Sequence, residues 1–81
     1  MNDVELKSLA ISWIHKRSRD LKTRPYSISA QEVAKAVGGY AGSVGRIADD
    51  VVAELEGQGL AVRYVRGSRP CRFELLQKKA A

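Results

Sequence analysis

Residues 60–76, which read LAVRYVRGSRPCRFELL, decide the fold of this chain. Two short runs of alternating apolar and polar residues flank a turn at 67–70, Gly-Ser-Arg-Pro. Alternation with a period of two, interrupted by a glycine and a proline, is typical of a β-hairpin with one packed and one solvated face. The packed face is expected to hold Leu60, Val62, Tyr64, Cys71, Phe73 and Leu75.

The same hairpin is strongly basic. Arginines occur at positions 63, 66, 69 and 72, and no acidic residue lies between 63 and 72. Elsewhere the charge is segregated, because residues 16–24 carry five basic residues against one acidic, whereas residues 43–57 carry one arginine against four acidic. The formal net charge of +5 favours a polyanion as partner. We expect the tip and the outer face of the hairpin to be its contact surface.

The first segment, residues 3–21, has the apolar spacing of a helix. A proline at position 25 ends it, because proline disfavours helical geometry in Arg24. Val4, Ile11 and His15 lie on another side of this helix, and they are either scattered surface residues or a small patch for a partner. The core stripe is expected to be Leu6, Leu9, Ala10, Trp13, Ile14 and Leu21.

A short extended segment at 26–28 is a candidate third strand beside the hairpin. Ser29 and Glu32 then form the pattern of a capping box, which predicts a helix at 30–37. This second helix is expected to bury Val33, Ala34 and Val37.

The glycine-rich turn 38–42 follows the second helix, and Ser43 resembles the N-cap of a third helix at 44–56. The turn is not a P-loop, because no Gly-Lys-Ser/Thr follows it. The apolar stripe of the third helix is expected to be Val44, Ile47, Ala48, Val51, Val52 and Leu55.

Size and composition predict one small domain, residues 1–76, and a basic flexible tail, residues 77–81. With one cysteine and one histidine, we expect no disulfide within the chain, no zinc site and no other metal or cofactor. No set of nucleophile, base and orienting group is present, so we expect no enzymatic activity. The sequence shows neither a membrane span nor the layout of a signal peptide, which makes a cytoplasmic location the default expectation.

The order helix, short strand, helix, tight turn, helix and two-stranded hairpin resembles the winged helix-turn-helix family over about residues 4–76. The resemblance rests on this order, on the spacing and on the capping box at Ser29, and it implies an α+β fold. It also implies a small regulator of transcription that binds double-stranded DNA, with the third helix in the major groove and the hairpin, or wing, along the backbone or in the minor groove.

Carried onto this sequence, the resemblance implies DNA contacts at the wing, at the start of the second helix and at the entrance of the third. Arg46 is either a base reader, since arginine donates two hydrogen bonds to guanine, or a surface charge paired with Asp49 or Asp50. The expected contact residues are Ser29, Gln31, Lys35, Tyr40, Gly42, Ser43, Arg46, Arg63, Arg66, Arg69 and Arg72.

The acidic residues of the third helix depart from this pattern, because carboxylates repel phosphates. Three arrangements account for them: only the first turn of the helix enters the groove, the wing does most of the binding, or the acidic face binds protein. A protein-interaction winged helix within a larger assembly and an RNA- or ribosome-associated winged helix are therefore the alternatives. A homodimer through the first helix is a further expectation of the resemblance.

Overall fold

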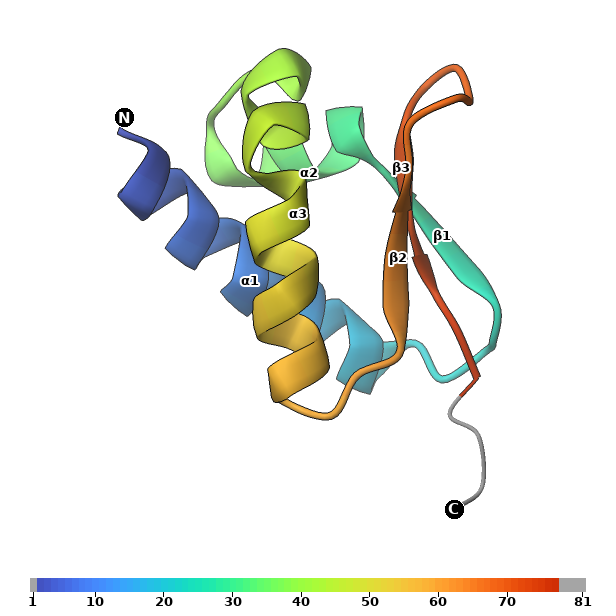
Figure 1. Cartoon of the computed structure of the whole chain (residues 1–81). Coiled ribbons are helices and arrows are strands. Elements are labelled where there is room, and N and C mark those ends of the chain that lie inside the picture. The colour runs from blue at the N-terminus through green and yellow to red at the C-terminus, as the bar shows by residue number, and fades with distance from the viewer. Residues whose placement is uncertain (1, 78–81) are drawn as a thin grey trace.

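The computed structural model describes residues 2–77 and shows a small α+β domain with three helices packed on one face of a three-stranded antiparallel sheet (Figure 1). The predicted order of elements is confirmed. The tail predicted at 77–81 lies, apart from Gln77, outside the described residues. The elements are α1 (Asp3–Asp20), β1 (Tyr26–Ser29), α2 (Ala30–Val37), α3 (Ala41–Gly57), β2 (Val62–Val65) and β3 (Arg72–Leu75).

The hairpin β2–β3 forms as predicted, and β1 joins it, so that the strand order is β1-β3-β2. Ile28 of β1 and Tyr64 of β2 both lie opposite Phe73, the fully buried centre of the sheet. Since side chains alternate along a strand, this register turns the aromatic and aliphatic residues toward the helices. The rings of Tyr64 and Phe73 pack with their centroids 4.7 Å apart.

The start of α2 confirms the Ser29 half of the predicted capping box, because the Ser29 hydroxyl accepts a hydrogen bond from the backbone N–H of Glu32 at 3.0 Å. At its other end, α2 stops at Gly38, which adopts the left-handed conformation with φ 81°. The following Gly39 packs closely on α1, since a Cβ at this position would lie 3.0 Å from a methyl carbon of Leu6.

The third helix begins earlier than predicted, at Ala41, and its N-cap is Tyr40 rather than Ser43. The first helical bond runs from the Val44 N–H to the Tyr40 carbonyl at 3.0 Å, which places Ser43 inside the first turn. The tight turn against α1 and the burial of Val44 set this start, whereas the sequence pattern showed only a suitable capping side chain.

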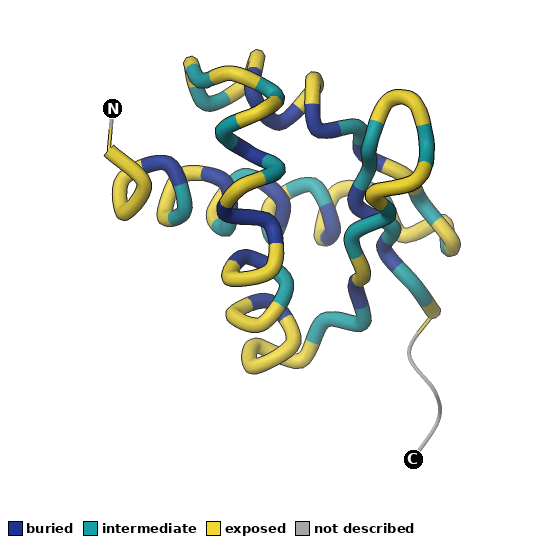
Figure 2. The backbone as a smooth tube through the Cα atoms, turned by 45° about the horizontal axis from the view of Figure 1, so that its top comes forward, coloured by how far each residue is buried: buried dark blue, intermediate teal, exposed yellow. Residues whose placement is uncertain are grey.

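The core lies between the helices and the inner face of the sheet, where Figure 2 shows the buried segments facing one another. It confirms most of the predicted stripe of each element. The placement of Leu9 in the core was wrong, because Leu9 is 46% exposed. The predicted core residues that are only partly buried are Trp13, Leu21, Val37, Val52, Leu60, Tyr64 and Cys71. The buried residues are Leu6, Ala10, Ile14, Ser18, Ile28, Ala30, Val33, Ala34, Val44, Ile47, Ala48, Val51, Leu55, Val62, Phe73 and Leu75.

The buried stripe of α1 follows the spacing 6, 10, 14 and 18, and this explains the error at Leu9. Ser18 lies on this buried stripe, and its hydroxyl donates to the His15 carbonyl at 2.6 Å, which offsets the cost of burying it without a partner from another element. The stripe therefore runs along positions four residues apart, and Leu9 falls outside it. Ile11, predicted to lie on a separate patch, packs against the core instead.

Candidate functional site

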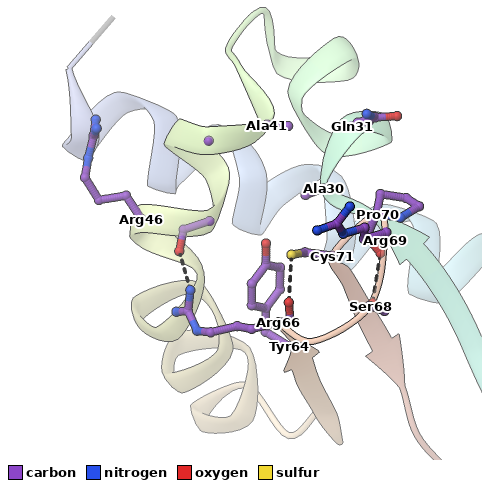
Figure 3. Close-up of a pocket in the computed structure, with 12 residues that line it drawn as sticks. Ala30, Gln31, Ala41, Arg46, Tyr64, Arg66, Ser68, Arg69, Pro70 and Cys71 are labelled. Atoms are coloured by element: carbon purple, nitrogen blue, oxygen red, sulfur yellow. Dashed lines mark hydrogen bonds between the residues drawn. The ribbon is translucent and has the colours of Figure 1, made fainter.

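A cavity of about 540 Å³ opens between the hairpin tip, residues 66–71, and the amino-terminal ends of α2 and α3 (Figure 3). We call it the tip cavity. A hydrogen bond from the Ala30 N–H to the Cys71 carbonyl, 2.8 Å long, ties the start of α2 to the end of the tip. The cavity has three arginines and no carboxylate in its lining, which consists of Ala30, Gln31, Ala41, Gly42, Gly45, Arg46, Tyr64, Arg66, Ser68, Arg69, Pro70 and Cys71.

The tip loop folds back on itself through two side chains. The Ser68 hydroxyl donates to the Pro70 carbonyl at 2.9 Å, and the Cys71 thiol donates to the Arg66 carbonyl at 3.2 Å. Cys71 thus behaves as a packing and hydrogen-bonding residue of the loop. These two bonds hold the tip in a compact shape beside α3.

Arg66 lies across α3 and makes three contacts with its neighbours. It forms an ion pair with Asp49 at 3.0 Å, donates to the Gly45 carbonyl at 3.2 Å, and places its guanidinium 5.0 Å from the centre of the Tyr64 ring. Desolvation by burial raises the pKa of Tyr64, and its interactions with Cys71 add to this rise. Because Asp49 pairs with Arg66, the positive charge of Arg66 is partly balanced before any partner binds.

Arg69 differs from the other arginines of the hairpin. Its side chain is exposed at the rim of the tip cavity (Figure 3), and within residues 2–77 it has no carboxylate within ion-pair distance. It is the hairpin cation with the least competition for an incoming anion.

Arg63 and Arg72 lie on the outer face of the sheet, away from the tip cavity. Both pair with Glu74, at 2.7 Å and 3.8 Å respectively, and this carboxylate is only 13% exposed. Glu74 is directly opposite Arg63 in the strand register and two residues beyond Arg72 on the same face. The outer face is therefore mostly basic, as expected, but its acidic residue pairs with both of the arginines expected to contact DNA there.

Arg46 turns away from the tip cavity toward α1, as Figure 3 shows. It donates two hydrogen bonds to the Asp3 carboxylate, 2.7 Å and 3.2 Å long. This contact lowers the pKa of Asp3, chiefly through the hydrogen bond, and raises the pKa of Arg46. Arg46 is thus a paired surface charge, but its partner is Asp3 rather than either acidic residue predicted on its own helix.

The remaining predicted contacts are divided between two places. Gln31 and Gly42 line the tip cavity, whereas Tyr40 and Ser43 line a smaller hollow of about 100 Å³ against α1. Ser29 uses its hydroxyl to cap α2, and Lys35 is exposed outside the lining of the cavity. Tyr40 is 81% exposed and makes no side-chain capping bond, so it leaves the first backbone N–H groups of α3 without a cap from its side chain.

Sequence reasoning missed Gly45, which with Gly42 gives α3 a surface without side chains. A Cβ at Gly42 would meet nothing within 4 Å, and one at Gly45 would meet the Tyr64 hydroxyl at 3.4 Å. The spacing of three residues, which places both on one face of a helix, was the available signal.

Part of the basic segment 16–24 is used inside the fold. Arg17 donates to the Tyr26 hydroxyl at 3.1 Å and lies over the Trp13 ring, with 5.5 Å to its centre. Arg24 donates to the carbonyls of Leu21 and Ser18 and so satisfies the carboxyl-terminal end of α1. These two arginines are structural, whereas Lys16 and Arg19 remain exposed.

No family model matches the sequence, and neither a curated protein nor a solved structure is significantly similar to it. Within residues 2–77, no three His, Cys, Asp or Glu side chains gather in a way that could hold a metal ion. No helix in the same part of the chain is long and apolar enough to cross a membrane.

Proposed function

We propose that this protein is a DNA-binding winged helix that acts as a small regulator of transcription and binds duplex DNA at the tip cavity. In this proposal α2, the turn 38–40 and α3 form the helix-turn-helix, and β2–β3 is the wing. The order of the elements and the antiparallel sheet support it, since both agree with the pattern expected of that family.

The composition of the tip cavity carries the proposal. Arg66 and Arg69 of the hairpin tip line it without a carboxylate, and the uncapped start of α3 adds backbone N–H groups at its edge. Arginine side chains and helix amino termini are the groups that bind phosphates, both by charge and by hydrogen bonding. A sugar–phosphate backbone is the partner that uses both kinds of group.

The proposed contact surface includes fewer of the hairpin arginines than the sequence alone indicates. Arg69 and the free edge of Arg66 contact phosphates, while the glycine surface of α3 lets the backbone approach. Arg63 and Arg72 contribute only a general positive field, because Glu74 holds them on the outer face. With about three phosphates neutralised, the logarithm of the affinity falls with the logarithm of salt at a slope of roughly −3.

The test is a fluorescence-anisotropy titration of the full chain with a labelled duplex of about 20 base pairs over a series of salt concentrations. Binding with a slope between about −2 and −5 supports the proposal, and no binding or a slope near zero contradicts it. A structured RNA of equal length is titrated in parallel, and tighter binding to RNA favours the RNA-associated alternative.

A matched pair of double variants separates a specific contact surface from general positive charge. Arg66→Ala/Arg69→Ala and Lys16→Ala/Arg19→Ala remove the same charge, from the tip and from exposed positions of α1. We expect the first to weaken binding by about 30- to 100-fold at 0.1 M salt and to flatten the slope by about 2, and the second to change affinity less than about threefold. Equal losses in the two variants would contradict the tip cavity as the site.

The acidic half of α3 favours a second candidate function, which is binding of a basic protein. Asp50, Glu54 and Glu56 are exposed there, and none of them pairs with a basic residue within the described chain. Micromolar binding to a basic partner, lost in Asp50→Asn/Glu54→Gln, together with no binding to duplex DNA, would favour this candidate.

A homodimer through α1 stays a prediction. The exposed apolar residues of that helix are Val4 and Leu9, which are 74% and 46% exposed. They lie about 140° apart around the helix axis, so they do not form one continuous stripe.

A further inference from the structure

The first two turns of α3 present few side chains to an approaching duplex. The exposed or half-exposed positions between residues 41 and 49 are Ala41, Gly42, Ser43, Gly45, Arg46 and Asp49. Two of these are glycines, and a glycine offers no group with which to recognise a base. Reading a base pair in the major groove by hydrogen bonds requires donors and acceptors, such as those of a bidentate arginine, asparagine or glutamine.

Ala41 carries only a methyl group, and the three polar side chains lie against other parts of the molecule. Arg46 is held by two hydrogen bonds to Asp3 and points to α1. Asp49 pairs with Arg66, which is itself fixed by the Gly45 carbonyl and the face of Tyr64. Ser43 lines the small hollow against α1, on the side of Asp3 and Tyr40, and not the tip cavity.

What remains at the tip cavity suits a backbone rather than bases. Arg69, the outer edge of Arg66 and the first N–H groups of α3 are phosphate-binding groups. Ala41, Gly42 and Gly45 form a smooth helix surface beside them, against which a deoxyribose can pack. Gln31 at the start of α2 is the one amide side chain of the lining, and an amide is suited to bidentate recognition of adenine.

From these observations we propose that the protein binds duplex DNA through its sugar–phosphate backbone with little regard to base sequence, because α3 has no uncommitted base-reading side chain at the tip cavity. This inference rests on the proposed function and specifies its partner: any duplex of suitable shape, rather than a single operator. Discrimination at Gln31 is limited to one base pair, which corresponds to a ratio of dissociation constants of about 5- to 150-fold.

The experiment is selection of bound duplexes from a random pool by the full chain, followed by anisotropy titration of the most enriched duplex and a scrambled duplex of the same length and composition. We expect no consensus longer than one base pair and dissociation constants within about 150-fold of each other, whereas a sequence-specific reader differs by about 10³- to 10⁷-fold. A consensus of several base pairs, or a ratio above about 150-fold, would overturn the inference and leave the proposed function standing. No binding to any duplex would overturn both.

The variant Arg46→Ala provides a second, independent measurement. Arg46 and Asp3 are both exposed, so loss of their ion pair leaves the fold intact. We expect the affinity for enriched and scrambled duplexes to change equally and by less than about threefold. A loss above about tenfold confined to the enriched duplex would show that Arg46 leaves Asp3 to read a base, and the inference would fail.

Discussion

The two ends of α3 differ in charge and in surroundings although they belong to one continuous helix. The amino-terminal end carries two glycines beside the arginines of the tip cavity. The carboxyl-terminal end exposes Asp50, Glu54 and Glu56. Both ends bury the same kind of apolar stripe, so the core does not distinguish them. The two ends therefore suit different partners. The charge at the amino-terminal end favours the approach of a polyanion, and the carboxylates at the carboxyl-terminal end repel one.

The largest expected difference in DNA affinity is between two variants that each place a carboxylate at one end of α3. Gly42→Glu and Gly57→Glu both add one negative charge at a position where a Cβ meets nothing within 4 Å. A like charge facing phosphates costs several kcal/mol, so we expect Gly42→Glu to weaken DNA binding by about 100-fold or more. Gly57→Glu is expected to weaken it less than about threefold, because salt screens charges on the far end of the helix.

Both glycine variants are expected to fold, since replacing glycine in a helix by glutamate improves helix propensity by somewhat under about 1 kcal/mol. Thermal unfolding followed by circular dichroism checks this before the binding titration. Equal affinities of the two variants would show that the ends of α3 are equivalent for DNA, and the comparison would fail.

Removing charge from the acidic end gives a smaller effect of the opposite sign. In Asp50→Asn/Glu54→Gln, two exposed carboxylates become neutral amides of nearly the same shape. Because these groups repel phosphates at a distance and are screened, we expect duplex affinity to rise by about two- to fivefold at 0.1 M salt, and less at higher salt. The same titration series measures this. An unchanged affinity at low salt would show that the acidic end is too far from the bound DNA for its charge to affect binding.

The smallest effect concerns the ion pair between Arg46 and Asp3, at the amino-terminal end. Arg46 lowers the pKa of Asp3 in the folded chain below its unfolded value of about 3.9. The pair therefore stabilises the fold above that pH, and this contribution is lost as the pH falls through the folded pKa. Carboxyl-carbon NMR titration should show the Asp3 pKa rising toward its unfolded value in Arg46→Gln. An unchanged pKa would show that the two side chains do not pair in solution.

Much of this molecule was predicted from local patterns. The alternation in residues 60–76 gave the hairpin, the spacing of apolar residues gave three helices, and Ser29 gave the start of α2. Each of these patterns acts over a few residues, where backbone geometry and burial on one face leave little choice. The start of α3 was misplaced because a suitable capping residue, Ser43, lay three positions beyond the turn that sets it.

The tip cavity itself was predicted only in part. The arginines of the hairpin and the ends of the helices were recognised as candidate contacts, and the structure brings Gln31, Gly42, Arg66 and Arg69 together. It keeps Arg63 and Arg72 on the other face of the sheet and turns Arg46 toward α1. Gly45 was not recognised although its spacing from Gly42 places both on one helix face, and only the structure shows that the Tyr64 hydroxyl lies across from it.

The sequence by itself determined the order of the elements, the packed faces and the excess of positive charge in the hairpin. Only the tertiary structure decided which of those charges are available to a partner. Arg46 and Asp3 are 43 residues apart in the chain, and Arg66 reaches Asp49 from another element. Surface ion pairs of long charged side chains stabilise a fold by only about 0–1 kcal/mol each. Pairs this weak do not produce a recognisable pattern in the sequence. Those pairings exist only after the core has placed the backbones side by side.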